Sequence, residues 1–371
     1  MLIDGGPWGS SVLPEAARTG ADPAPGNPVA ALREIAFWRE RAGADTHRVK
    51  AYRRAADTVA GMTEEHIAGL GVTKTAWQRV QGIGASTAAA ICESLAGGVP
   101  RGLAEARAGA APTLAAEDAA GRALFARARG DLHMHTEASD GGAPLTEMAA
   151  VAARLGREYI AISDHSPRLR VANGLSPQRL REQIASIATL NAALQRDGVE
   201  LRVLTAIEVD ILEDGSLDQE EDLLAELDIV VGSVHSELRM PSAAMTRRMV
   251  TAIANPHLDV LGHCTGRLVT GSRGTRPPSQ FEAEIVFAAA ESFGTAIEIN
   301  ARPERCDPPD ALIDLALESG CLFAVDSDSH APGQQDWLAL GYSRAAAREV
   351  PAGRIVTTWD VEELLAWTRA V

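Results

Sequence analysis

The pattern of hydrophobic positions along the chain changes at about residue 120. Within residues 29–98, Leu32, Ile35 and Ala36 show the i, i+3, i+4 spacing of an amphipathic helix. After residue 120, short β-rich runs alternate with helical stretches rich in Ala and Leu. This pattern predicts several short helices followed by an α/β domain whose parallel strands are joined by helices.

Seven runs of the second half predict strands: ARGDLHMH, EYIAISDH, LRVLTAIEVD, LDIVVGSVH, LDVLGHC, TAIEIN and LFAVDSDSH. Helices are predicted between many of them, in stretches such as LTEMAAVAARLG, SPQRLREQIASIATLNAALQRDG and PDALIDLALESG. We therefore expect residues 129–371 to form one α/β domain and residues 29–98 a helical domain. Residues 99–128 are expected as a linker with some helix, and the Gly- and Pro-rich residues 1–28 as a disordered tail.

Charge and cysteine content narrow the classes of protein to which the chain can belong. Its 371 residues carry a formal charge of −15, which argues against a protein that coats nucleic acid or an anionic membrane through its overall field. Four widely spaced cysteines do not predict a disulfide framework or a zinc ribbon. The sequence shows no signal peptide and no run of about 18 apolar residues, so we expect a cytoplasmic protein with no membrane contact.

Polar groups that can bind metal or substrate stand where the predicted strands end. They are His133, His135, His165, Glu208, His235, His263, Asn300, Asp328 and His330. Six of the nine histidines of the chain are among them, whereas chance placement would scatter them. In closed α/β barrels the carboxyl ends of the strands converge on one mouth, which carries the chemistry.

The spacing of these residues favours a metal centre. His133 and His135 stand at i and i+2 of a predicted strand, so both imidazoles face one side, and Asp328 and His330 repeat that spacing. Imidazole and carboxylate together suit Zn, Mn or Fe ions better than Ca²⁺. So many ligands predict two or three divalent ions, and ions about 3.5–4 Å apart can clamp the oxygens of a phosphate ester during hydrolysis.

These motifs resemble those of the PHP (polymerase and histidinol phosphatase) superfamily, in the version attached to bacterial family X DNA polymerases. HMHTEASDG, ISDHS, IEVDI, GSVHS, GHCTGR, EIN and DSDSH occur in the family's order within about residues 129–345. The resemblance implies a distorted (β/α)7 barrel with a three-metal site at its mouth. It places His133, His135, Glu208 and Asp328 on one metal, Asp140, His165 and His330 on a second, and His235 and His263 on a third that Glu208 bridges to the first. Glu208, Asp328 and Arg267 are the expected catalytic residues.

The N-terminal region, residues 29–98, resembles the small DNA-end-binding domain of the same polymerases. THRVKAYRRAADTVAGM and VQGIGASTAAAICESLAGG match it, the second with a helix-hairpin-helix element. Backbone N–H groups of a Gly-x-Gly turn at a helix N-terminus can face a DNA phosphate. The residues expected to contact DNA are His47, Arg48, Arg53, Gly82 and Gly84.

Two departures from the polymerases remove activities that the resemblance would otherwise imply. Ala90 stands where relatives with lyase activity place a Schiff-base lysine, so we expect no lyase reaction. About 30 residues, 99–128, separate the helical domain from the barrel, which is too few for the polymerase palm and fingers. We therefore expect that the protein does not polymerise DNA.

Several residues near the predicted site keep a structural alternative. Asp140 can cap a turn instead of binding metal, and Asp164 and Asp326 can cap strand ends or support the ligands. Loop arginines are usually solvated, but beside a metal cluster they can hold a substrate phosphate, and we expect Arg168, Arg267 and Asn300 to contact the substrate, with Arg302 nearby. His66 and His257 are expected to be surface histidines, and Cys264 a buried apolar residue.

The sequence thus predicts a hydrolase that acts on phosphate ester bonds with divalent metal ions. The first hypothesis is a DNA end-processing enzyme, a 3′–5′ exonuclease or 3′-phosphatase, because a DNA-end-binding domain is attached to the barrel. The second is a phosphatase for small molecules such as histidinol phosphate, and the third a non-catalytic DNA-repair scaffold. The formal charge of residues 29–98, with nine Lys and Arg against seven Asp and Glu, favours a local DNA contact only mildly. The pattern leaves the oligomeric state open.

Overall fold

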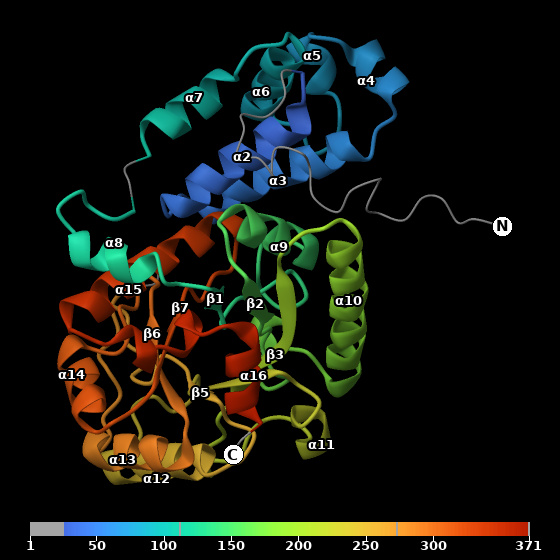
Figure 1. Ribbon diagram of the computed structural model, residues 1–371. Coiled ribbons are helices and arrows are strands. Elements are labelled where there is room, and N and C mark those ends of the chain that lie inside the picture. The colour runs from blue at the N-terminus through green and yellow to red at the C-terminus, as the bar shows by residue number, and fades with distance from the viewer. Residues whose placement is uncertain (1–25, 111–112, 272–273, 370–371) are drawn as a thin grey trace. The chain divides into compact units, whose positions relative to one another are not determined.

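The computed structural model describes residues 26–110, 113–271 and 274–369 of the chain. The chain forms two compact units, one built mainly from residues 26–110 and one mainly from residues 113–369 (Figure 1). The tail expected over residues 1–28 lies almost entirely outside the described residues. Among the helices in the described ranges, none has the length and apolar character that crossing a membrane requires.

The strands and helices assigned within residues 26–110 are all helices, as the i, i+3, i+4 pattern predicts. Its helices are α2 (Pro28–Arg41), α3 (Thr46–Ala60), α4 (Glu64–Leu70), α5 (Lys74–Trp77), α6 (Ala85–Leu95) and α7 (Arg101–Ala108). Leu32, Ile35 and Ile91 are completely buried and pack with Trp77 in one apolar core. The helices therefore have a shared core of their own.

The second unit contains a single sheet of seven parallel strands, in agreement with the seven runs in the sequence. The strands are β1 (Gly130–Asp131), β2 (Tyr159–Ile162), β3 (Arg202–Asp210), β4 (Ile229–Ser233), β5 (Val260–Leu261), β6 (Ala296–Asn300) and β7 (Phe323–Asp326), and they pair in chain order. Sequential order with parallel pairing is the topology of a β/α barrel. The predicted distorted (β/α)7 barrel is confirmed.

Side chains close the seam between β7 and β1, where no continuous ladder of backbone hydrogen bonds forms. The carboxylate of Asp326 accepts from the N–H of Leu132 at 2.7 Å, and that of Asp131 accepts from the N–H of Ser327 at 3.1 Å. Beyond them, a single parallel bridge pairs Met134 with Ser329. The two aspartates thus replace backbone acceptors and bring the last strand next to the first.

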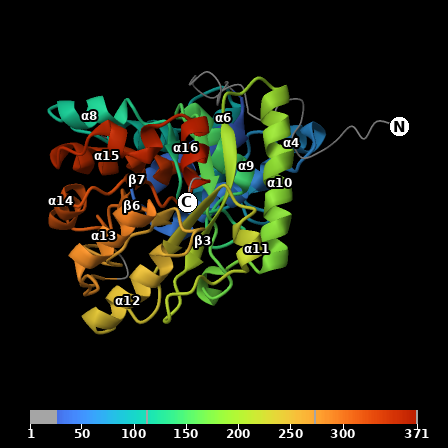
Figure 2. The same ribbon diagram turned by 60° about the horizontal axis from the view of Figure 1, so that its bottom comes forward.

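Helices cover the outside of the strands, as Figures 1 and 2 show for α10, α12, α13 and α14. The helices of this unit are α8 (Ala119–Phe125), α9 (Leu145–Arg154), α10 (Pro177–Arg196), α11 (Glu221–Leu224), α12 (Ser242–Ile253), α13 (Ala283–Phe293), α14 (Asp310–Glu318), α15 (Leu338–Ala347) and α16 (Val361–Thr368). Short 3₁₀ turns occupy Arg170–Ala172, Pro332–Trp337, Ala352–Arg354 and Val356–Thr358. The start of α10 follows from its sequence, because the hydroxyl of Ser176 accepts from the N–H of Arg179 and Pro177 supplies a helical φ angle.

Five strands, β1, β2, β4, β5 and β7, end before the runs that predict them, and the difference is largest at β1 and β7. β1 stops at Asp131, so His133 and His135 follow the strand instead of lying within it, and β7 stops at Asp326, two residues before Asp328. Asp328 then adopts a left-handed conformation with φ of 49°. The physical reason is the seam, where side chains take the place of the ladder and free the backbone to turn.

Candidate metal centre

The barrel interior changes from apolar to ionisable toward the carboxyl ends of the strands. On β3 the alternating positions Leu204, Ala206 and Glu208 share one side, and the two apolar residues belong to the inner core. On β7 the same alternation places Asp326 above Ala324. The fold therefore closes one end of the barrel with apolar side chains and collects carboxylates and imidazoles at the other.

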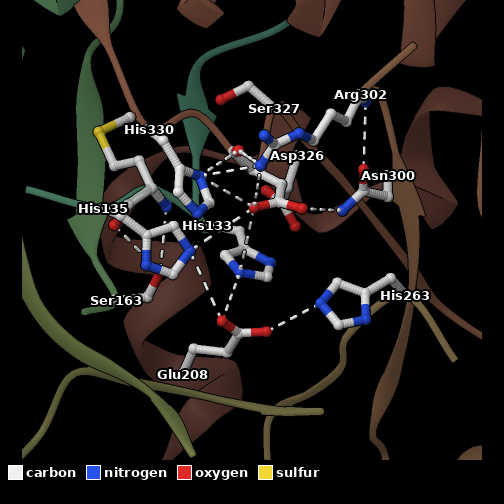
Figure 3. A network of polar contacts seen from close by, with 12 residues as sticks. His133, His135, Ser163, Glu208, His263, Asn300, Arg302, Asp326, Ser327 and His330 are labelled. Atoms are coloured by element: carbon white, nitrogen blue, oxygen red, sulfur yellow. Dashed lines mark hydrogen bonds and ion pairs between the residues drawn. The ribbon is translucent and has the colours of Figure 1, made fainter. Parts of the chain in front are cut away.

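Glu208 lies at the centre of this polar end, with 1% of its surface exposed. Five imidazole nitrogens surround its carboxylate: His165 Nδ1 at 2.8 Å, His263 Nε2 at 2.9 Å, His235 Nε2 at 3.3 Å, His133 Nε2 at 3.4 Å and His135 Nε2 at 3.5 Å. Figure 3 shows Glu208 between His263 on one side and His133 and His135 on the other. A single carboxylate can therefore contact more than one ion.

The structure brings all nine expected metal ligands together. They form four overlapping groups whose ligand atoms lie within 4.8 Å of one another: His135 with Asp140, His165 and His330; His133 with His135 and Asp328; His133 with Glu208 and His263; and His165 with Glu208 and His235. Overlapping groups of this kind suit several neighbouring ions better than one.

Buried nitrogens without partners show that the donor set fits metal ions. Both ring nitrogens of His135, Nε2 of His133 and Nδ1 of His263 are buried and make no hydrogen bond within the described residues. Leaving such a group unsatisfied costs about 1–3 kcal/mol. Neutral imidazole nitrogens and carboxylate oxygens are the ligands of Zn, Mn and Fe ions. The residues present therefore fit divalent metal ions of this kind.

Burial and neighbouring ionisable groups shift the pKa values of the side chains in the centre. Burial opposes ionisation of Glu208, but His133, His235 and His165 outweigh it and hold the pKa of that carboxyl well below its usual range. Burial, followed by His135 and Arg302, holds the pKa of His330 well below its usual range, so this imidazole is neutral and able to bind a metal. For His235 burial is outweighed by Glu208 and Asp210, which raise its pKa to about 9.

Three side chains from the loop after β6 and from β6 itself hold the Asp328 carboxylate. Arg305 donates from Nε to Asp328 Oδ2 at 2.9 Å, Asn300 donates from Nδ2 to the same oxygen at 3.1 Å, and Arg302 Nη1 lies 3.5 Å from Oδ1. Arg302 also donates to Nδ1 of His330 at 3.0 Å. Burial favours the neutral acid, but Arg302 and Arg305 keep the pKa of Asp328 well below its usual range.

The residues expected to touch substrate differ in where the structure places them. The Arg267 guanidinium donates to the backbone carbonyls of Arg305, at 3.1 Å, and Cys306, so it holds the loop that carries Arg305. The side chain of Asn300 is buried and engaged with Asp328 and Glu298. Arg168 is exposed, and its backbone N–H binds Asp218. The arginines that face the ligands are Arg302, which the sequence analysis placed beside the site, and Arg305, which it missed.

Two further carboxylates next to the histidines were missed, although alternation could have found them. Asp210 stands two residues after Glu208 on β3, and its Oδ1 lies 2.5 Å from Nδ1 of His235. Glu298 stands two residues before Asn300 on β6, and its Oε1 lies 2.6 Å from Nδ1 of His133. A carboxylate two residues before or after a site residue on a strand therefore indicates a side chain on the same face, close to the site. No such signal exists for Arg305, which lies in an irregular loop.

In the helical unit, the residues expected at DNA fall into two sets. His47 and Arg48 are exposed near the start of α3, and Gly82 adopts a φ of 88° in the turn before Gly84 and α6. Arg53 is instead 6% exposed and forms two hydrogen bonds of 2.6 Å to Glu40. Because this guanidinium is committed to a buried ion pair, it is not available to a phosphate.

Comparison with known proteins agrees with both units. Residues 131–302 match the PHP domain model, and residues 26–100 match a helix-hairpin-helix domain model. A probable phosphatase of Thermoanaerobacter sp. strain X514 is 31% identical over 214 residues, which cover 54% of this chain and 78% of the relative. The chain belongs to the PHP superfamily. With family membership and this ligand set, it is a metal-dependent hydrolase of phosphate esters.

A second relative of this PHP protein is the DNA polymerase/3′–5′ exonuclease PolX of Bacillus subtilis. It is 38% identical over 217 residues, which are 58% of this chain but only 37% of the length of PolX. Among solved structures, histidinol phosphate phosphatase of Lactococcus lactis, in complex with zinc, L-histidinol and phosphate, aligns with a TM-score of 0.44 at 18% identity, over 61% of this chain and 94% of that chain.

Proposed function

We propose that this PHP protein is a DNA end-processing phosphoesterase, a 3′–5′ exonuclease or 3′-phosphatase. The observation that carries the proposal is the presence, in one chain, of a helix-hairpin-helix domain and a barrel in which nine potential metal ligands converge. The B. subtilis relative is named as a DNA polymerase and 3′–5′ exonuclease, and this supports DNA as the substrate. The exposed His47 and Arg48 and the turn at Gly82 and Gly84 would contact the DNA end.

Two or three divalent ions, Zn, Mn or Fe, would be held by the clustered ligands. One would take His133, His135, Glu208 and Asp328; a second Asp140, His165 and His330; and a third His235 and His263, with Glu208 shared between the first and third. When bound, such ions activate water and neutralise charge on a phosphoryl group. The geometry supports these sets in part: His133 groups with His135 and Asp328, and Asp140 groups with His165 and His330, whereas His235 and His263 fall in separate groups that share Glu208.

The chain's own side chains would add orientation and charge. Arg302 and Arg305 lie beside Asp328 and would neutralise the equatorial oxygens of the phosphoryl group as negative charge develops. Arg267 would act through the loop that it holds, since its guanidinium binds the carbonyls of Arg305 and Cys306. This assignment moves the direct substrate contact from Arg267 to Arg302 and Arg305. Glu208 and Asp328 keep the central role proposed for them.

A phosphatase for small phosphomonoesters is the second candidate. It is supported by the probable phosphatase from Thermoanaerobacter, because this chain covers 78% of that relative. In this case the helical domain would have no part in turnover. A non-catalytic scaffold is disfavoured, because all nine ligand positions keep a residue type that binds metal and their atoms converge.

The deciding experiment incubates the full chain with Mn²⁺ and a 5′-labelled single-stranded oligonucleotide, and in parallel with p-nitrophenyl phosphate. Asp328→Ala controls for contaminating nucleases, and Asp314→Ala, which removes a half-exposed carboxylate of α14, is the matched control. A ladder of shortened products that only Asp328→Ala loses supports the exonuclease. An intact oligonucleotide together with turnover of p-nitrophenyl phosphate supports the small-molecule phosphatase. Inactivity on both substrates would contradict the proposal that the protein hydrolyses either of them.

A further inference from the structure

Glu298 is a buried carboxylate that contacts two of the proposed metal ligands, His133 through its ring and His263 through its backbone. It lies on β6 and is completely inaccessible to solvent. Its Oε1 is 2.6 Å from Nδ1 of His133, and its Oε2 accepts from the backbone N–H of His263 at 2.5 Å. Asn300 donates to Oε2 as well, at 3.2 Å, and also binds Asp328. One side chain therefore connects ligands that come from three strands.

Glu298 determines which nitrogen of the His133 ring is left for a metal. An ionised carboxylate can only accept hydrogen bonds, so Nδ1 of His133 carries a proton, and Nε2 is the nitrogen that a metal can bind when the ring is neutral. That Nε2 is buried without a hydrogen-bond partner, 3.4 Å from Glu208 Oε2 and 4.0 Å from Asp328 Oδ1. The contact thus selects the tautomer whose free nitrogen points at the other ligands.

The residues around Glu298 indicate that its carboxylate supports the metal ligands and does not only stabilise the fold. Within the described residues, no Lys or Arg forms an ion pair with it, and its hydrogen-bond partners are His133, His263 and Asn300. Alternation on β6 places it above Ala296, in the inner layer where an apolar side chain would fill the space. Among the described residues, the cation that can pair with Glu298 is the His133 ring, 2.6 Å from Oε1. Burying a carboxylate is costly, and positive charge at the neighbouring ligands would offset that cost.

We propose that Glu298 is a positioning residue for the ion held by His133 and the ion held by His263. It sets the tautomer and ring orientation of His133, and it fixes the backbone at His263 so that the imidazole meets Glu208 at 2.9 Å. The inference rests on the proposed metal centre, which supplies the ions. Loss of such a partner typically weakens metal binding about 10- to 100-fold.

The test measures Mn²⁺ binding to the full chain by competition with a chelating dye, and the visible spectrum of the Co²⁺-loaded protein. Glu298→Gln keeps the size of the side chain, but its amide can accept only one of the two hydrogen bonds and faces the other donor with N–H groups. We expect at least one Mn²⁺ dissociation constant to rise about 10- to 100-fold and the Co²⁺ spectrum to change. Glu298→Asp, which keeps the charge but cannot reach both donors, provides a second variant if the glutamine prevents folding.

Asp259→Asn is the matched control, because Asp259 is also a buried barrel carboxylate that accepts a backbone hydrogen bond, from Val230 at 2.7 Å. It should bind Mn²⁺ as the wild type does. In a His133→Ala background, Glu298→Gln should add much less than it does alone, since part of its effect passes through that ring. Mn²⁺ affinities and a Co²⁺ spectrum unchanged by Glu298→Gln would overturn the inference while leaving the metal centre intact. A wild-type protein that binds no Mn²⁺ would instead overturn the metal centre itself.

Discussion

Arg305 and Asp328 form a close ion pair at the barrel mouth, with Nε 2.9 Å from Oδ2. Only 12% of the arginine side chain and 2% of the aspartate side chain are exposed. The Coulomb attraction within an ion pair shielded from water is stronger than within one on the surface, although desolvation of the two charges offsets part of it. The pair holds a positive charge beside the proposed ligands, where negative charge would develop on a phosphoryl group.

Replacing Arg305 should therefore reduce turnover more than replacing a surface arginine. We expect Arg305→Ala to lower kcat about 10²- to 10³-fold, the usual effect of losing one group that stabilises developing charge. Arg305→Lys should recover little, because an ammonium cannot reproduce the planar guanidinium contact. Steady-state kinetics on the substrate that the wild type turns over provides the measurement. Arg348→Ala, which breaks a half-exposed pair with Asp314 at 3.3 Å, is the control, and equal losses in both variants would contradict the role of Arg305.

Short-range patterns in the sequence predicted the fold and the gathering of the ligands. Hydrophobic periodicity predicts the strands and helices, and parallel strands must end at one mouth, so His165, Glu208 and His235 meet although they are far apart in sequence. The i, i+2 spacing of His133 and His135 survives even though β1 ends before them. Their convergence depends on topology more than on the exact ends of the strands.

These patterns do not predict which side chains from different elements form hydrogen bonds or ion pairs with one another. Nothing near Arg53 in the sequence distinguishes it from Arg48, yet the first is buried against Glu40, 13 positions away, and the second is exposed. Arg267 was expected to contact a phosphate because it is a loop arginine beside the predicted metal cluster, but its guanidinium donates to backbone carbonyls of a loop nearly 40 residues later. Side-chain partners of this kind depend on packing between elements, which periodicity does not encode.

The contrast between Arg48 and Arg53 leads to opposite expectations for two similar substitutions. Arg48→Ala should weaken binding to a 5′-phosphorylated duplex end and lower the salt dependence by about one phosphate contact, without loss of stability. Arg53→Ala should leave the buried Glu40 carboxylate without its cation and destabilise the helical unit by about 3–5 kcal/mol. Fluorescence anisotropy at several salt concentrations and hydrogen exchange of α3 separate the two effects. An Arg53→Ala protein with unchanged exchange in α3 would show that the ion pair is dispensable.

The two glycines of the helix-hairpin-helix turn should also differ. Gly82 has a φ of 88°, and an added Cβ would lie 3.2 Å from the side chain of Arg54, so Gly82→Ala should strain the turn by about 1–2 kcal/mol and weaken DNA binding. Gly84 has a φ of −93° and open space around the position of a Cβ, so Gly84→Ala is the matched control. Thermal unfolding and anisotropy with the same duplex measure both effects. Equal behaviour of the two variants would argue against a requirement for the left-handed turn.

The state of His235 predicts how metal binding depends on pH. In the metal-free protein burial opposes its charge, but Glu208 and Asp210 raise its pKa to about 9, so the imidazole holds a proton below that pH. A metal must displace this proton, and affinity should therefore keep rising with pH up to about 9 rather than levelling off above the usual histidine value of about 6.5. Calorimetric titration with Mn²⁺ between pH 6 and 8.5, in buffers of different ionisation enthalpy, counts the protons released. Asp210→Asn removes a carboxylate 2.5 Å from the ring, so its affinity should level off at a lower pH, and a wild-type affinity that is flat above pH 7.5 would rule out the protonated His235.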